Sequence, residues 1–406
     1  MGVNRLINFG MPRQALILSL IRLLDGLVTG ILLVSIPLYT AELFPTFIRL
    51  PEPILIGLGV SVYSMMNSIL QPSLGTLSDR TGRRKPFIVS GYVIIGVCCL
   101  AYIFNDHYET FLLLRILQGA GISLVFAAAF SQMVVTTKQP YRGRALGAHQ
   151  ALRRIGLTLG PMLGGSFYVL FGLDAALLTC VGLMLIAFLL AQWLLEDLPT
   201  DSHHKQVESR TFRQAGSPEM GFYALGASLM IVGASFAMVA VLESEFSIRL
   251  QMTVIGFGMA FTSSSLSQLI FQVPAGFVSD RIGHKKIIML GLVMLGLTTL
   301  LMGIVHTSTF FLVLRFCQGI ASAGIIVPAL AMAANLSRSG QEGNQMGIVS
   351  MGYGIGSSLG PLLTSMLIFV SFEFSFLVIA ILILLCTWVI YRYVPKDSDI
   401  ARSSIE

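Results

Sequence analysis

Apolar runs of about 20 residues recur along the chain from its beginning to its end, with short polar segments between them. A helix of about 20 residues crosses the hydrocarbon core of a bilayer, which is ~30 Å thick. Hydrophobic residues make up 55% of the 406 residues, more than the core of a soluble protein requires. We therefore expect an all-α integral membrane protein. We also expect its first apolar run to remain as a span, because it is too long for a cleaved signal peptide.

Twelve transmembrane helices fit this pattern, and the polar segments between them alternate in charge. Most lysines and arginines lie in one set of loops, whereas acids dominate the other set. Because positively charged loops remain on the cytoplasmic side, this asymmetry predicts a multi-pass protein of the cell (cytoplasmic or inner) membrane with both termini in the cytoplasm. The same positions argue against a nucleic-acid partner, despite the net charge of +6. The predicted spans are 14–40, 54–76, 86–105, 110–135, 145–170, 174–195, 219–242, 253–278, 286–305, 309–334, 345–370 and 372–394.

The two halves of the chain carry the same motifs in the same order. QPSLGTLSDRTGRRK at 71–85 corresponds to QVPAGFVSDRIGHKK at 272–286, and LLLRILQGAGIS at 112–123 corresponds to LVLRFCQGIASA at 312–323. A third pair, GLTLGP and GSSLGP, follows at nearly the same offset. These matches predict two parallel six-helix repeats, an arrangement typical of transporters with a central site between the repeats. We place an N-terminal bundle at 1–197, a cytoplasmic linker at 198–218, a C-terminal bundle at 219–395 and a cytoplasmic tail at 396–406.

These motifs resemble those of the major facilitator superfamily, and the resemblance covers essentially the whole chain. The loop at 75–85 resembles the family's motif between helices 2 and 3, and residues 115–121 resemble its helix 4 motif. Residues 156–165 resemble the helix 5 motif G-x-x-x-G-P-x-x-G-G of the twelve-helix drug:proton antiporters. The resemblance implies a proton-coupled antiporter that exports a small amphiphilic organic compound by alternating access.

The loop motif concentrates charge where two helices meet. Asp79 lies where a helix ends, so its carboxylate can accept hydrogen bonds from Arg83 or from the N-terminus of a neighbouring helix. In the family such a network latches the two halves in the outward-facing state. The alternative is that the basic residues only fix topology, which is the role we expect for Arg84 and Lys85. The expected gating residues are Gly75, Asp79, Arg80, Gly82 and Arg83, with Asp280 and Arg281 in a weaker, pH-sensitive second copy that has His284 in place of Arg83.

Two charged residues inside predicted spans are the candidates for proton coupling. An ionisable group at membrane depth costs at least about 2.5 kcal/mol, so it should face a cavity or a partner. Asp25 lies about 15 Å along the first span, and Arg22 lies one turn before it on the same face. Arg115 lies at a comparable depth, and the family's helix 4 arginine is tied to proton coupling. We expect Asp25 to carry the proton and Arg115 to modulate it. The alternative is a static Arg22–Asp25 ion pair that braces the first helix.

Arg153 and Arg154 lie about 13 Å into the fifth span, where the second repeat has no charge. Adjacent helical residues point about 100° apart, so we expect one of the two to face the cavity. A net positive site favours an anionic or zwitterionic substrate; in the alternative, both side chains reach back to the cytoplasm. Other polar side chains in the spans should face the cavity or bridge helices. The expected substrate-binding residues are Arg22, Tyr39, Asn67, Gln71, Arg153, Arg154, Gln268 and Gln272.

Glycines spaced four apart in the fifth and eleventh spans allow two helices to approach closely, and a proline in each bends the helix. We expect these two stripes to pack against each other as the seam between the halves. Arg315, the repeat of Arg115, is expected to pair with Glu243 or Glu245. His149 is expected at the membrane interface rather than in a proton relay. The expected helix-packing residues are Gly156, Gly160, Pro161, Gly164, Gly356, Gly360 and Pro361.

No cofactor or metal is expected. The five cysteines lie inside apolar runs without metal-ligand spacing, and the sequence has no ATP-binding loop, which argues against an enzyme. The expected partners are a small-molecule substrate, protons and the lipid bilayer, and the protein is expected to be a monomer. The alternatives to drug export are an importer or uniporter of an organic anion, a lipid flippase and, more remotely, a membrane sensor or enzyme.

Overall fold

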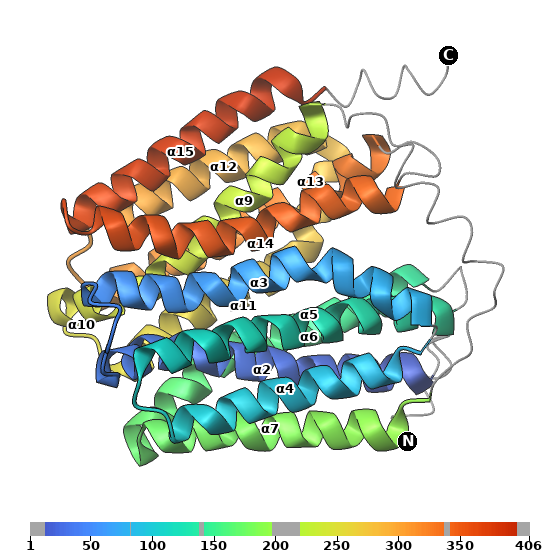
Figure 1. Cartoon of the computed structure of the whole chain (residues 1–406). Coiled ribbons are helices and arrows are strands. Elements are labelled where there is room, and N and C mark those ends of the chain that lie inside the picture. Colours follow the sequence, from blue (N-terminus) through green and yellow to red (C-terminus); the bar gives the residue numbers. More distant parts are fainter. Residues whose placement is uncertain (1–12, 82, 138–141, 197–219, 337–341, 396–406) are drawn as a thin grey trace. The chain divides into compact units, whose positions relative to one another are not determined.

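The computed structural model describes residues 13–81, 83–137, 142–196, 220–336 and 342–395 (Figure 1). Within these ranges, the side chains of residues 76, 79, 80, 134, 142–144 and 342–348 are left out of the description. The predicted linker and C-terminal tail lie outside the described residues. Contacts divide the chain into two compact units, which we treat one at a time. Unit 1 comprises 1–55, 62–202 and 254–258, and unit 2 comprises 56–61, 203–253 and 259–406.

The described part of the chain is built from helices, and twelve long ones correspond one by one to the predicted spans. Their ends agree with the predicted ends to within a few residues. The bounds are α2 Arg13–Glu42, α3 Glu52–Thr81, α4 Lys85–Ile103, α5 Tyr108–Thr136, α6 Arg142–Phe171, α7 Leu173–Leu194, α9 Met220–Val241, α11 Val254–Ile282, α12 His284–Met302, α13 Ser308–Leu336, α14 Glu342–Leu367 and α15 Phe372–Tyr393.

Ten of these helices are both long enough and apolar enough to cross a membrane. The other two, α6 and α14, contain 30 and 26 residues and so have the length to cross as well. Their apolar character is diluted by glycine and serine and, in α6, by arginine. Length and composition together therefore agree with an integral membrane protein of many spans.

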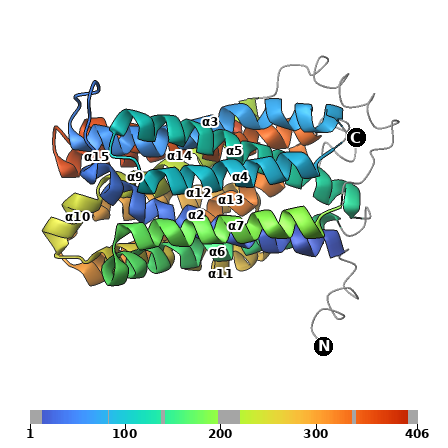
Figure 2. The same ribbon diagram turned by 60° about the horizontal axis from the view of Figure 1, so that its bottom comes forward.

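The same packing pattern occurs inside each half of the chain. The first helix of each half packs most extensively on the fifth, which pairs α2 with α6 and α9 with α14. The third helix of each half contacts the fourth and the sixth, so that α4 lies beside α5 and α7, and α12 lies beside α13 and α15. Figures 1 and 2 both show α2 running alongside α6. The internal sequence repeat is therefore also a repeat of helix packing.

A short helix that the sequence analysis did not predict, α10 (Glu243–Leu250), follows α9. Its Phe246 ring stacks on Phe311, with the ring centroids 4.2 Å apart, and also contacts Phe372 edge-on. On the outer side of the helix, the Arg249 guanidinium lies 4.2 Å from the Phe372 ring centroid. These aromatic contacts fix α10 against α13 and α15 within unit 2.

The glycines of α6 allow it to lie directly against the backbone of α2. A Cβ atom placed at Gly160 would lie 2.7 Å from the Cα of Gly30, and one placed at Gly164 would lie 3.0 Å from the Cα of Ile31. In unit 2, a Cβ at Gly360 would lie 2.6 Å from the Cα of Ala234 on α9. Each stripe therefore packs on the first helix of its own half. The predicted seam between the fifth and eleventh spans is wrong, because spacing identifies a small face on a helix but not the helix that it meets.

Candidate functional site

Asp25 lies at the centre of a buried charge cluster in unit 1. Its side chain is 3% exposed, and its Oδ2 accepts a hydrogen bond from Arg22 Nη1 at 2.6 Å. Arg153 Nε lies 3.5 Å from the same oxygen. Arg22 precedes Asp25 by three residues on α2, which places the two on one helix face. Arg153 comes from α6, so the cluster joins two helices.

The close crossing of α2 and α6 brings Arg153 to Asp25. Gly26 directly follows Asp25, and a Cβ atom there would collide with the carbonyl oxygen of Arg153. On α6, a Cβ at Gly156 would lie 2.6 Å from the backbone nitrogen of Leu27. The glycines therefore determine how near the guanidinium approaches the carboxylate. Of the two candidate arginines on α6, Arg153 is the one that contacts Asp25. Arg154 is half-buried, and its carbonyl accepts a hydrogen bond from Thr158.

The cluster carries two positive charges and one negative charge, which gives it a net charge of +1. Removing ions from water costs several kcal/mol per ion, so each guanidinium depends on the carboxylate it contacts. A proton on Asp25 would raise the net charge to +2 without moving any other group. The predicted Arg22–Asp25 pair is present. The contact from Arg153 makes it more than a brace within one helix.

Three nitrogen atoms of Arg22, Arg153 and the nearby His149 are buried and have no hydrogen-bond partner among the described residues: Arg22 Nε, Arg153 Nε and His149 Nδ1. His149 precedes Arg153 by four residues on α6, so both lie on one face of the helix. His149 is only 4% exposed, so it faces the protein interior, and its depth relative to the membrane interface stays a prediction. The i, i+4 spacing to Arg153 is the signal that could have placed His149 at the site. Unused polar atoms at one place provide binding capacity for water or for a polar ligand.

Aromatic rings surround the charges. The guanidinium of Arg22 lies 4.9 Å from the ring centroid of Phe126, and that of Arg115 lies 4.4 Å from Tyr63. Tyr63 lies in the electrostatic field of Arg115 and also in that of Asp25, Arg22 and Arg153. Tyr63 and Phe126 were not among the predicted site residues, because an aromatic residue in a span gives no signal that separates a site from ordinary packing.

Arg115 is held by a hydrogen-bond network inside unit 1. Its Nη1 donates to Gln118 Oε1 at 2.7 Å, and the Tyr102 hydroxyl donates to the same oxygen at 3.0 Å. Gln118 therefore connects α5 to α4, which is the bridging role expected for it. Arg115 is 5% exposed, so the guanidinium lies inside the bundle as predicted.

The repeat of this arginine, Arg315, is fully buried in unit 2. It donates to Gln318 Oε1, and its Nε donates to the carbonyl of Ala260 at 3.3 Å. The rings of Phe236 and Phe261 lie at 5.3 and 4.6 Å from its guanidinium. The expected pairing with Glu243 or Glu245 is wrong: Glu245 pairs with Arg249, and Glu243 accepts from Ser247. The expected pairing was based only on how far along its helix each residue lies, and this placed the acids nearer to Arg315 than they are.

The remaining predicted substrate-binding residues differ in exposure. The Tyr39 hydroxyl donates to the carbonyls of Tyr102 and Asn105, both at 2.8 Å, so this residue is committed to packing at the end of the bundle. Asn67 Oδ1 is buried with no partner among the described residues, which suits a ligand contact. Gln71 is half-buried, Gln268 is buried and Gln272 is exposed.

The gating motif is described only in part. Gly82 and the side chains of Asp79 and Arg80 lie outside the described residues. Gly75 is not forced by packing, since a Cβ there would lie 3.5 Å from Ala127 Cβ, an ordinary contact. Arg83 is exposed. Arg84 is buried and its Nε donates to Ser131 Oγ at 2.8 Å, so its expected role in topology and lipid contact alone is wrong.

The second copy of the motif joins neighbouring helices in unit 2. His284 Nε2, at the start of α12, lies 3.4 Å from Asp280 Oδ1 near the end of α11. Lys285 Nζ donates to the carbonyls of Tyr391 at 2.9 Å and Val394 at 2.6 Å, and so caps the end of α15. Arg281 is exposed. A pH-sensitive latch at Asp280 and His284 stays a prediction.

The sequence matches the family model described as Major Facilitator Superfamily over residues 18–242 and again over 222–405. The synaptic vesicular amine transporter of Mus musculus is 32% identical to this chain over 324 residues. The match covers 77% of this chain and 60% of that transporter. The class E tetracycline resistance protein of Escherichia coli is 24% identical over 88% of each chain.

Solved structures show the same fold at low sequence identity. A bacterial homolog of the human lysosomal transporter Spinster covers 94% of this chain and 96% of its own, with a TM-score of 0.77 and 14% identity. The human organic anion transporter MFSD10 covers 93% of this chain and 99% of its own, with a TM-score of 0.67 and 18% identity.

Proposed function

Because the chain belongs to the Major Facilitator Superfamily, we propose that it is a proton-coupled antiporter that exports a small amphiphilic organic compound by alternating access. The observation that carries this proposal is the buried carboxylate of Asp25 between the guanidiniums of Arg22 and Arg153. Asp25 supplies the carboxylate of this cluster and is therefore the group we assign as the proton carrier, since arginine remains charged. The tetracycline resistance relative supports export.

Antiport requires that the proton and the substrate exclude each other. A zwitterionic substrate meets this requirement if its ammonium group contacts ionised Asp25 while its anionic group contacts Arg153. Protonation of Asp25 then removes the acceptor for the ammonium group and releases the substrate. Arg115 acts on this exchange through its own charge and through Tyr63, which lies in the field of both groups. Asn67 of α3, whose Oδ1 is buried without a partner among the described residues, adds a polar group to the lining within unit 1.

A second candidate is an importer or uniporter of a purely anionic compound, and the net charge of +1 is the observation that favours it. An anion binds more tightly when Asp25 is neutral, because the Asp25 carboxylate then no longer competes with the anion for Arg22 and Arg153. In a proton-coupled importer, proton and substrate would therefore bind together and cross the membrane in the same direction, whereas a uniporter would move the anion without a proton. The sign of the coupling therefore separates the two candidates.

From the loop charges we also infer that both termini lie in the cytoplasm. We infer further that the protein is a monomer in the cell membrane. The halves rock against each other around the site, and Asp79, Arg80 and Arg83 latch one end of the cycle. Asp280 and His284 add the second copy of the latch. The bundle boundaries 1–197 and 219–395 follow from the same repeat.

A ligand survey on the purified full-length protein tests the choice of substrate class. We expect zwitterionic ligands to raise the melting temperature more than cationic ligands of the same size and hydrophobicity, because Arg22 and Arg153 repel a lone cation. This stabilisation should weaken as the pH is lowered and Asp25 takes up its proton. Anionic ligands that stabilise more strongly at lower pH would support the second candidate instead, and a general preference for cations would contradict both.

A further inference from the structure

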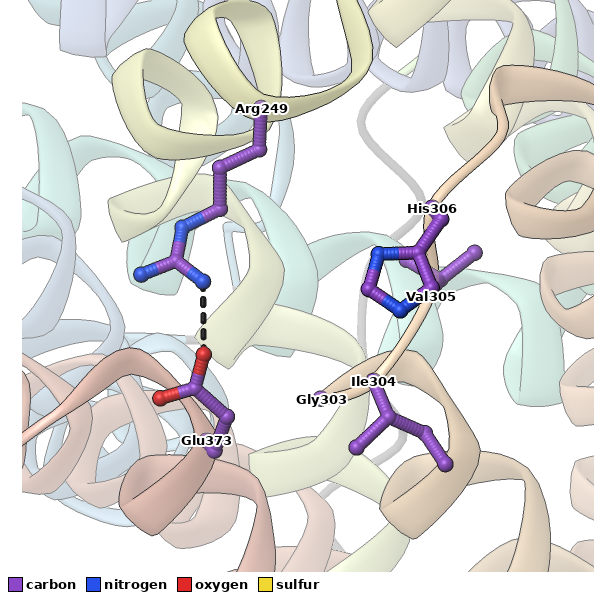
Figure 3. A pocket seen from close by; sticks show the side chains of 6 residues that line it. All are labelled: Arg249, Gly303, Ile304, Val305, His306 and Glu373. Carbon is purple, nitrogen blue, oxygen red and sulfur yellow. Dashed lines mark hydrogen bonds and ion pairs between the residues drawn. The ribbon is translucent and has the colours of Figure 1, made fainter.

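Two adjoining cavities form a groove at one end of unit 2, where α12 ends at Met302 and α15 begins at Phe372. The first has a volume of about 320 Å³ and is lined by Arg249, Gly303, Ile304, Val305, His306 and Glu373 (Figure 3). The second, of about 310 Å³, shares Gly303, Ile304 and Glu373 with the first. It adds Leu300, Ser371, Phe374 and Leu377, so the groove runs from a polar end to an apolar end.

The polar end presents one positive and one negative group to solvent. Arg249 Nη1, from α10, donates to Glu373 Oε1 at 2.6 Å, and the two side chains are 42% and 49% exposed. Figure 3 shows the imidazole of His306 across the opening from this ion pair. A carboxylate has about four lone-pair sites, so Glu373 can accept further hydrogen bonds beside the one from Arg249. The lining is therefore neutral overall but can bind both signs of charge.

The apolar end continues along two neighbouring helices. On α12, the exposed side chains of Val293, Leu297 and Leu300 are spaced four and three residues apart, which places them on one face. The exposed Ile304 follows the end of the helix. On α15, a second exposed stripe runs from Phe374 to Tyr391, and Leu384 lies ten residues beyond its start. These helices pack against each other. Ten residues of helix span about 15 Å, which matches the thickness of one leaflet of the hydrocarbon core.

We propose that this groove binds one phospholipid whose zwitterionic headgroup carries a primary ammonium group. The ammonium group donates to the Glu373 carboxylate, and the phosphodiester accepts from Arg249 and His306. One acyl chain lies along the exposed stripes of α12 and α15. A quaternary ammonium headgroup has no N–H to donate, and a net anionic headgroup meets the charge of Glu373. The lipid would thereby join α10 to α12 and α15, and the acidic loops place it in the outer leaflet.

This lipid site is independent of the transport substrate and of the Asp25 cluster, since its lining residues all belong to unit 2. Native mass spectrometry of the delipidated full-length protein in detergent tests it. The probes are phosphatidylethanolamine, phosphatidylcholine and phosphatidylglycerol with identical acyl chains. We expect phosphatidylethanolamine to bind about fivefold more tightly than the other two, the upper end for an exposed ion pair. Equal binding of the three lipids would overturn the proposal.

Two variants and one control locate the site. Glu373→Gln should abolish the preference for phosphatidylethanolamine, because the amide has no charge to attract the ammonium group. Leu377→Trp should lower the binding of all three lipids by filling the apolar end while leaving the ion pair in place. Glu245→Gln is the control. It removes the ion pair between Glu245 and Arg249 Nε, which lie 3.2 Å apart on α10. Glu245 itself does not line the groove. Loss of the preference in the control, its persistence in Glu373→Gln, or unchanged lipid binding in Leu377→Trp would contradict the assignment.

Discussion

Asp25→Asn should abolish transport driven by a pH gradient, with a fall of about 100-fold or more, the scale on which a positioned proton-transfer group acts. The amide cannot take up a proton, so the net charge of the cluster would no longer change during the cycle. Exchange of labelled for unlabelled substrate across the membrane needs no net proton movement. It should therefore continue at higher substrate concentrations, because the neutral amide binds the ammonium group less tightly, and it should no longer depend on pH. The measurement is uptake into proteoliposomes, made once with an imposed pH gradient and once as counterflow.

Controls must separate loss of coupling from loss of folding. Removing Asp25 leaves the buried Arg22 and the half-buried Arg153 without a carboxylate, and breaking a buried pair such as Arg22–Asp25 costs about 3–5 kcal/mol. Asp25→Glu keeps the carboxylate and should retain coupled transport. Asp174→Asn alters an exposed acid in the first turn of α7 and should behave as the wild type. An Asp25→Asn protein that still accumulates substrate against its gradient would show that the proton is carried elsewhere.

Gly156→Ala should be a strongly damaging single-methyl substitution next to the charge cluster. The new Cβ would lie 2.6 Å from the backbone nitrogen of Leu27 and would also collide with the carbonyl oxygen of Leu23. Backbone atoms cannot rotate away as a side chain can, so α6 must move off α2. We expect the free energy of unfolding to fall by about 1–3 kcal/mol. Transport should fall with it, because the contact between Arg153 and Asp25 depends on this crossing.

Gly147→Ala, on the same helix, is the matched control. A Cβ there has nothing within 4 Å, so the substitution should only favour the helix, by up to about 1 kcal/mol. Thermal unfolding of the two detergent-solubilised variants, followed by size-exclusion chromatography, checks the pair. If both alanine variants melt at the wild-type temperature, the close crossing of α2 and α6 does not support the site.

Apolar periodicity was enough to predict the twelve long helices. The internal sequence repeat was enough to predict that the second half repeats the first. The eight-residue α10 was missed because it is too short and too polar to give a span signal. Patterns along one helix predicted the Arg22–Asp25 pair, since three residues separate its members. Contacts between helices were harder to predict: the α6 glycines face α2 rather than α14, and Arg315 lies among phenylalanines rather than acids.

The burial of polar residues near span ends was also hard to predict. Arg84 lies just before a predicted span, where a side chain can reach water, and contact with lipid headgroups was expected for it. The structure instead buries Arg84 against Ser131, and it also turns His149 of α6 into the protein interior. The depth of a residue along a helix does not determine which way its side chain points, and that direction decides between an interface and a site.

Proton movement coupled to substrate movement tests the account most directly. Proteoliposomes that contain the wild-type protein and an internal pH dye would receive, on the outside, a ligand identified in the survey. Antiport predicts that the lumen becomes more alkaline as substrate enters and protons leave, and that Asp25→Asn proteoliposomes show no change. Acidification of the lumen, or substrate entry with no proton movement at all, would contradict the central claim.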